Sequence, residues 1–280
     1  MLKMTINRAP HPALAPYVEY VTGGQNDGAI TSINHFVYKD IPNANSRIVF
    51  KIGPDSDEIY LWAEGPRLEL KEVSANAIEI FAFTVKPGAL KALIGIPVSV
   101  LSNQVVDLSQ IWGEEAEILK DEIYEASYLE ERIAVLEKAL IRRVTAFQGM
   151  DYFAQDLAGL IRQQGGHGTL EPIFLKSGYC ERQVLRKFND WMGMGPKQYA
   201  RIVRCRNLIE NLNISEEQNW SGLAKSYRYF DRTHLAGDFQ KLLGKLPSGF
   251  IGDFKGRASF LPGQAKRNII VYSPILETAS

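Results

Sequence analysis

Apolar positions divide the chain into a strand-rich first part and a helical remainder. Apolar and β-branched side chains dominate residues 46–52, 58–62 and 77–85, and a Gly-Pro pair follows each of the first two runs. Runs punctuated in this way predict strands joined by turns. Residues 77–85 are apolar at odd and even positions alike, which favours a strand buried on both faces. Short helices are expected at 12–21 and 88–94.

Between residues 113 and 147 the apolar spacing changes to three and four, which indicates helices. The apolar side of the second helix is marked by Leu129, Ile133, Leu136, Leu140 and Val144, and its other side is charged. Ser127, followed by Glu130, predicts a capping box at the start of this helix. We favour a pair of helices that simply pack together; a dimer contact or an interdomain connector is the alternative.

The last part of the chain contains an internal repeat. An offset of 51 residues relates Phe188, Gly193, Pro196 and Tyr199 to Phe239, Gly244, Pro247 and Phe250, and also Val184 to Leu235. Farther upstream the offset falls to 50, so the turn of the second copy is one residue longer. Each copy has the pattern of a short helix, a tight turn and a longer helix ended by a glycine and a proline. The repeat therefore predicts two helix-turn-helix units.

Spacing within the first copy separates a buried side from an exposed side. Val184 and Phe188 are four residues apart and face a small core. Around the other side of the same helix lie Arg182, Leu185 and Arg186. A helix that exposes arginines in its N-terminal half fits a DNA major groove, where arginine donates two hydrogen bonds to guanine.

The distribution of charge supports a nucleic-acid partner. The 280-residue chain has 32 basic and 32 acidic residues, yet residues 1–150 carry a net −6 and residues 151–280 a net +6. The segment 176–207 holds eight basic and two acidic side chains. A net +6 in one compact helical segment suits a phosphate backbone.

Other classes of protein are disfavoured. Two cysteines exclude a disulfide framework, and four histidines far apart in sequence give no metal site. The N-terminus lacks the apolar core of a signal peptide, and no apolar run reaches the roughly 18 residues of a transmembrane helix. We therefore expect a cytoplasmic protein without membrane contact. No nucleophile elbow or phosphate-binding loop is present, so we expect neither enzymatic activity nor a cofactor.

The repeat resembles a known family. Residues 178–188 with 193–204 resemble the first helix-turn-helix and linker helix of AraC/XylS-type transcription regulators, and residues 223–239 with 244–247 resemble the second helix-turn-helix. The resemblance covers about residues 150–255. It implies seven helices, in which two reading helices are joined by a long helix and enter successive major grooves on one DNA face.

The first half is similar, more weakly, to a domain that precedes this module. The similar stretches are residues 12–18, 86–97 and 106–113. In such regulators the N-terminal half commonly senses a small molecule or mediates dimerisation. The resemblance therefore implies an effector of unspecified chemistry or a homodimer as further partners.

The chain departs from the family pattern at several positions. Phe174 replaces a usual Ala, and Cys180 replaces a usual Ser at the start of the first reading helix, where Cys is a poorer N-cap. Arg228 replaces a usual Gly in the second turn, where a left-handed backbone would strain it. Gly237, which follows Ala236, replaces a usual Arg in the second reading helix. The second unit is therefore expected to read fewer bases than the first.

Together these patterns predict an α+β N-terminal domain with a small, mostly antiparallel sheet and flanking helices, followed by an all-α C-terminal domain with two helix-turn-helix subdomains joined by a long helix. The expected segments are a sensor domain at 1–112, a helical connector at 113–148, the DNA-binding domain at 149–255 and a tail at 256–280. The expected function is a sequence-specific transcription regulator that binds double-stranded DNA. The alternative is a ligand-binding or protein-interaction protein with a degenerate DNA-binding module.

The expected contacts with DNA fall into two classes. Side chains expected to read bases are Arg182, Leu185, Arg186, Arg232 and Thr233. Side chains expected on phosphates are Lys187, Lys197 and Arg201. No catalytic or metal-ligating residue is expected.

Overall fold

The structure is a computed structural model of the chain, and it describes residues 2–26, 36–40, 45–53, 59–65, 71–75, 79–148, 152–169, 178–212, 218–254 and 270–274. Its strands are β1 (Leu2–Arg8), β2 (Val18–Asn26), β3 (Phe36–Asp40), β4 (Ser46–Ile52), β5 (Ile59–Glu64), β6 (Lys71–Ala75), β7 (Glu79–Val85), β8 (Val105–Asp107) and β9 (Ile270–Pro274). The first half of the chain also holds the short 3-10 helices η1 (Pro12–Leu14) and η2 (Val98–Leu101) and the helices α1 (Leu90–Ile94), α2 (Ser109–Trp112), α3 (Glu114–Glu125) and α4 (Leu129–Ala146).

The strands form two antiparallel sheets. The larger has the order β1-β2-β7-β4-β5-β8, and every neighbouring pair in it is antiparallel. The smaller has the order β6-β3-β9, so a strand at 270–274 pairs with one at 36–40. The predicted strands at 46–52, 58–62 and 77–85 are confirmed over the described residues as β4, β5 and β7, while Glu58, Ala77 and Ile78 lie outside the described part of the chain.

Three sequence-based expectations need correction. Residues 12–21 are not one helix, because only 12–14 are helical and β2 begins at Val18. The expected tail at 256–280 contains β9, which pairs with the first half of the chain. No capping box joins Ser127 and Glu130: Tyr128 occupies the N-cap of α4, and the Ser127 N–H donates to Glu131 Oε2 at 2.8 Å.

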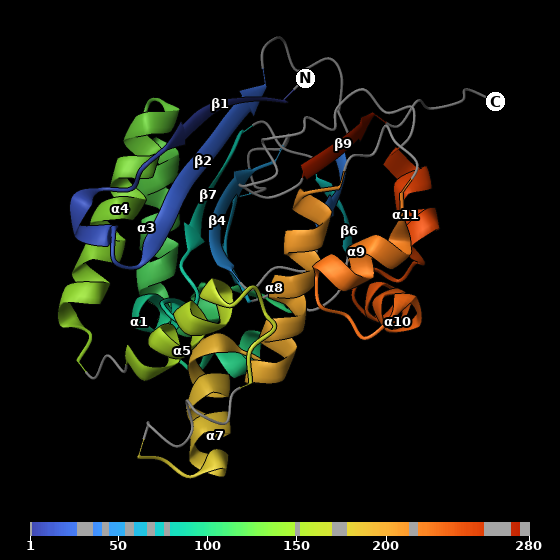
Figure 1. Cartoon of the computed structure of the whole chain (residues 1–280). Helices are drawn as coiled ribbons and strands as arrows, with labels where there is room; N and C mark the ends of the chain where they lie inside the picture. Colours follow the sequence, from blue (N-terminus) through green and yellow to red (C-terminus); the bar gives the residue numbers. More distant parts are fainter. Residues whose placement is uncertain are drawn as a thin grey trace.

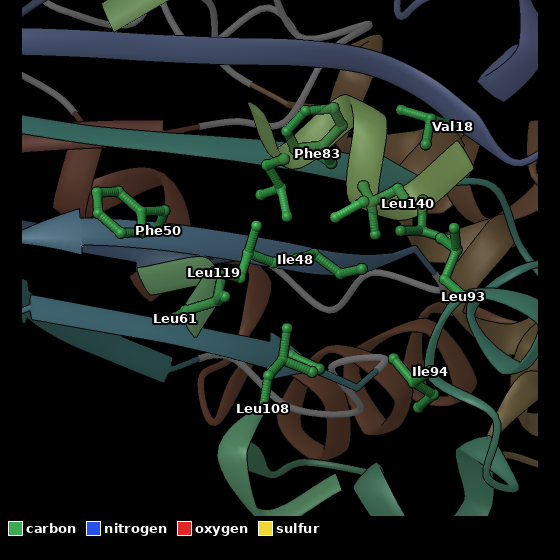
Figure 2. Packing of buried hydrophobic residues seen from close by; sticks show 14 of the residues in the cluster. Val18, Ile48, Phe50, Leu61, Phe83, Leu93, Ile94, Leu108, Leu119 and Leu140 are labelled. Atoms are coloured by element: carbon green, nitrogen blue, oxygen red, sulfur yellow. The ribbon is translucent and has the colours of Figure 1, made fainter. Parts of the chain in front are cut away.

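Helices α3 and α4 pack against each other and cover one side of the larger sheet, as Figure 1 shows. Alternate residues of β4 and β7, among them Ile48, Phe50 and Phe83, are fully buried in the core beneath these helices. Figure 2 shows Leu119 of α3 and Leu140 of α4 in the same cluster. Residues 113–148 therefore share the core of the N-terminal half, as the simpler interpretation predicts. The other side of β7 is also partly buried, with Thr84 1% exposed.

The C-terminal half is helical and has a core of its own. Its helices are α5 (Tyr152–Gln163), α7 (Glu181–Met192), α8 (Pro196–Glu210), α9 (Trp220–Ser226), α10 (Arg232–Leu243) and α11 (Pro247–Phe254). In Figure 1, α8 connects the segment containing α7 to the segment containing α10. Residues 170–177, which include Ile173, Phe174 and Lys176, lie outside the described part of the chain.

One end of α7 contacts the N-terminal half. The Ser102 hydroxyl after η2 donates to the Gly193 carbonyl, which follows α7. The Lys91 ammonium of α1 lies 4.8 Å from the centre of the Trp191 ring. The C-terminal end of α7 is therefore fixed on the N-terminal half, while its N-terminal end points away from it (Figure 1).

Candidate nucleic-acid interface

Both copies of the repeat bury the same positions. The buried apolar residues of α7 are Val184, Phe188, Trp191 and Met192, and those of α10 are Leu235, Phe239, Leu242 and Leu243. Each of the second four lies 51 residues after its counterpart. The predicted repeat is thus confirmed in the packing of the two helices, which we call the first and second reading helix.

The two reading helices also end alike. Gly193 and Gly244 adopt left-handed φ angles of 70° and 67°, which glycine accommodates without a Cβ clash. Ring pairs then hold the following helix in the same way. Phe188 meets Tyr199 edge-on with 5.7 Å between ring centres, and Phe239 meets Phe250 edge-on at 5.8 Å. These contacts fix the direction in which each reading helix projects.

The first reading helix exposes the side chains that the sequence assigned to bases. Arg182, Leu185 and Arg186 are all exposed, and Leu185 is 39% accessible despite being apolar. Cys180 occupies the N-cap, and its backbone N–H donates to Gln183 Oε1 at 3.0 Å. The glutamine thus satisfies the N-cap N–H in the manner of a capping box. The N-terminal half of the helix is therefore well formed, and its side chains Arg182, Leu185 and Arg186 are exposed among the described residues.

The three residues expected on phosphates have different surroundings. Lys197 is exposed near the start of α8. The Lys187 ammonium lies 4.8 Å from the centre of the Tyr179 ring, which is a cation–π contact. Arg201 is only half-buried, but its guanidinium donates to Asp238 Oδ1 from Nε at 3.0 Å and from Nη2 at 2.8 Å. The structure therefore gives Arg201 an intramolecular partner that the sequence did not predict.

The second reading helix has a better cap but fewer long side chains. Asp231 occupies the N-cap and accepts the His234 N–H at 2.7 Å, as its residue type predicts. Arg232 and Thr233 are exposed, as expected for base contacts. Gly237 is exposed as well, and a Cβ built on it meets no atom within 4 Å. It is the 51-residue counterpart of Arg186, so an arginine is present in one unit and missing from the other.

The turns before the two reading helices differ in backbone strain. Gly178 has a φ of 70° in the first turn, where no Cβ is present. Arg228 holds the corresponding place in the second turn with a φ of 53°, as the sequence predicted. A left-handed conformation costs an L-residue about 1–2 kcal/mol. The second turn is thus strained where the first is relaxed.

Asp238 joins the second reading helix to the connecting helix α8. Its side chain is 6% exposed, and besides Arg201 it accepts from Arg204 Nη2 at 3.3 Å. The 51-residue counterpart of Asp238 is Lys187, which is not buried. A signal was present in the sequence, since Asp238 lies among the apolar positions Leu235, Phe239 and Leu242. A charge at such a position predicts a buried ion pair.

Cationic and aromatic side chains gather where the two units meet α8. The Arg204 guanidinium lies 4.5 Å from the centre of the Tyr229 ring. Burial lowers the pKa of His167, which follows α5, and the nearby charges of Arg204 and Arg228 lower it further.

Burial raises the pKa of the Cys205 thiol on α8 to about 12. The thiol therefore stays protonated at neutral pH and acts as a core residue.

Sequence comparison finds one family model that matches part of the chain. The family described as a domain of unknown function, DUF6597, matches residues 7–107. No curated protein matches the chain in sequence.

Among the described residues, no group of three or more His, Cys, Asp or Glu side chains could hold a metal ion, and no helix is long and apolar enough to span a membrane.

Solved structures with similar coordinates include ToxT from Vibrio cholerae. ToxT of strain O395 is 10% identical over 80% of this chain and 95% of its own, with a TM-score of 0.38. ToxT bound to (E)-4-(8-methylnaphthalen-1-yl)but-3-enoic acid is 9% identical over 83% of this chain and 97% of its own, with a TM-score of 0.38. Wild-type ToxT of strain SCE256 bound to an unsaturated fatty acid has a TM-score of 0.36 at 9% identity over 79% of this chain and 91% of its own. TM-scores this low do not establish a shared fold.

Proposed function

We propose that the protein is a sequence-specific DNA-binding transcription regulator of the AraC/XylS type. One observation carries the proposal. Two copies of one scaffold each fix a helix by the same buried positions, the same glycine and the same ring contact, and each leaves the N-terminal half of that helix exposed. This is the arrangement that a protein needs to place two helices in successive grooves.

Arg182, Leu185 and Arg186 are the proposed base contacts of the first unit, and Arg232 and Thr233 those of the second. Each arginine has a long side chain that reaches guanine, while Leu185 suits a thymine methyl group. Lys187 and Lys197 are the proposed phosphate contacts. Arg201 uses Nε and Nη2 in its ion pair with Asp238, and this pair is proposed to position the second unit. The remaining N–H donors of Arg201 are proposed to contact phosphate.

The N-terminal half is proposed to control this module from the cytoplasm, as a sensor of a small molecule or as a dimer interface. Support comes from the contact between the two halves, because the C-terminal end of the first reading helix rests on residues 98–102. A change in the N-terminal half would therefore reorient this helix first. Sedimentation of the full-length protein tests the dimer, and a sedimenting monomer at micromolar concentration would remove it.

Replacement of Arg186 tests the proposal most simply. Arg186→Ala should cost about 1–3 kcal/mol of binding free energy and relax base preference at one position. Lys197→Ala is the matched control, because a phosphate contact should weaken all sequences about equally and reduce the salt dependence of binding. An equal loss on all sequences for Arg186→Ala would make this arginine a phosphate contact.

Two features of the second unit favour the alternative function, a ligand-binding or protein-interaction protein with a degenerate DNA-binding module. Arg228 strains the second turn, and Gly237 leaves the second reading helix without a side chain at an exposed position, as expected of a DNA-binding module in decay. The salt dependence of binding separates the two functions, because several phosphate contacts make affinity fall steeply as salt rises. A full-length protein that binds no duplex even at low salt would be a ligand-binding or protein-interaction protein.

A further inference from the structure

The two turns that lead into the reading helices differ in how far their aromatic residues are buried. The first turn has one aromatic, Tyr179, whose ring meets Phe153 edge-on at 5.4 Å between ring centres and carries the Lys187 ammonium above it. The second turn is one residue longer, and two aromatics, Tyr229 and Phe230, lie between its left-handed Arg228 and the N-cap Asp231. Tyr229 is 4% exposed and packs under Arg204. Phe230 is 92% exposed.

Phe230 is held outward by an ordered turn. Its backbone N–H donates to His234 Nδ1 at 3.3 Å, and the next residue, Asp231, caps the second reading helix through the His234 N–H. The buried Tyr229 fixes the other side, since its ring meets the His234 ring edge-on at 5.4 Å. A ring that is fully solvated in a fixed turn has its apolar area available for a partner.

The surroundings of Phe230 identify the chemistry of that partner. Arg228 and Arg232 are exposed on either side of it in sequence. Phe230 also stands directly before the N-terminus of the second reading helix, the end that enters a groove in this class of module. An apolar ring between two cations fits the edge of a DNA groove, where thymine methyl groups and deoxyriboses lie between phosphates.

Resting on the proposed function, we propose that Phe230 is a DNA-contacting residue that packs on a thymine methyl group at the edge of the groove entered by the second reading helix. The contact gives the second unit a base preference that does not need the missing arginine. It also explains why the longer turn directs its additional aromatic outward while it buries the other.

Binding of the wild-type protein and of Phe230→Ala to a selected duplex, with and without deoxyuridine in place of single thymines, tests the proposal. The full-length protein first selects its duplex from a random pool. Each thymine in the half of the site next to the second unit is then replaced by deoxyuridine, which removes only the methyl group. Phe230→Ala should bind the selected duplex about 5- to 20-fold more weakly. One deoxyuridine should weaken the wild-type protein by a similar factor and leave Phe230→Ala unaffected, because the variant has already lost that contact.

Two further variants control for folding and for general apolar loss. Leu246→Ala removes a side chain that is 55% exposed beyond the other end of the same helix, and it should bind within about twofold of wild type. Phe230→Leu keeps an apolar contact and should retain most of the affinity. Since Phe230 is almost fully exposed, Phe230→Ala should unfold at the same denaturant concentration as wild type.

The outcomes separate this proposal from the proposed function. If wild type binds its selected duplex and Phe230→Ala binds it equally well, Phe230 does not contact DNA, and a protein partner of the turn becomes the explanation of its exposure. A loss in Phe230→Ala that couples to no thymine methyl group also overturns the proposal. If wild type selects no duplex at all, the proposed function fails together with it.

Discussion

The two predicted helix-turn-helix units share a scaffold and differ in what they expose. Their buried positions coincide at an offset of 51 residues, and both reading helices end at a left-handed glycine. Their surfaces do not coincide, because Arg186 in the first unit corresponds to Gly237 in the second. Packing constrains every buried position of such a repeat, whereas an exposed position is free to change with the partner. Similar cores here carry dissimilar exposed surfaces.

The units also differ in how they are attached. The first contacts the N-terminal half through residues 98–102 and the end of α7, while the second is joined to α8 by the ion pairs of Asp238. Among the described residues, the first unit therefore contacts the N-terminal half directly, and the second is tied to the connecting helix α8. Four predictions sharpen or break this comparison.

The largest effect is expected at Asp238. Asp238→Ala leaves the two arginines of α8 without their buried partner and should lower the free energy of unfolding by about 3 kcal/mol. Lys187→Ala, at the corresponding position of the first unit, should change it by less than about 1 kcal/mol. Urea denaturation followed by circular dichroism measures both. Equal losses would show that the second unit does not depend on this ion pair for its attachment.

Substitutions at Arg228 and Gly178, one in each turn, should change the free energy of unfolding in opposite directions. Arg228→Gly relieves a left-handed backbone and should raise the free energy of unfolding by about 1 kcal/mol. Gly178→Ala introduces the same strain at a φ of 70° and should lower it by a similar amount, since a Cβ there meets no atom within 4 Å. The same denaturation experiment gives both values. Changes of the same sign would contradict the assignment of strain to the second turn alone.

An arginine should be tolerated, and useful, at Gly237. The open space around this residue accommodates a side chain, and removal of glycine should stabilise the helix by about 0.5–1 kcal/mol. Gly237→Ala controls for this helix effect. In a binding assay with the selected duplex carrying each base in turn, Gly237→Arg should prefer guanine at one position by about 3- to 10-fold over Gly237→Ala. Indistinguishable affinities would place Gly237 outside the groove.

The smallest effect concerns pH and the contact between the units. Burial, Arg204 and Arg228 lower the pKa of His167, so the unfolded chain binds a proton at a higher pH than the folded protein does. The free energy of unfolding should therefore fall as pH decreases below the ordinary histidine pKa, and it should be unaffected above it. His167→Gln should lose less stability than wild type between pH 7.5 and pH 5.5, both measured in urea. Parallel losses would mean that His167 does not sense its cationic neighbours in the folded state.

Sequence predicted the C-terminal half better than the N-terminal half for a physical reason. Val184, Phe188 and their counterparts follow helical spacing, which is local and repeats, so their burial could be inferred. The pairing of β3 with β9 joins residues more than 200 positions apart, and no local pattern specifies it. The larger sheet was likewise predicted through its central strands β4, β5 and β7. Strand β1 was missed, although Leu2, Met4 and Ile6 alternate with polar residues there.

The candidate site shows the same limit. The exposure of Arg182, Leu185 and Arg186 followed from their places around one helix. The ion pair of Arg201 with Asp238 did not, since it depends on how α8 lies across α10. The exposure of Phe230 was also missed, because two adjacent aromatics look alike in sequence and only the fold decides which of them is buried.

Selection of duplexes from a random pool by the full-length protein tests the central claim most directly. That claim is DNA recognition by two units of unequal specificity. The expected result is a lopsided site: one half well defined where the first unit binds, and a second half about one helical turn away that is loosely defined apart from a thymine. Equal information in both halves would contradict the unequal specificity of the two units, and recovery of no sequence would contradict DNA recognition itself.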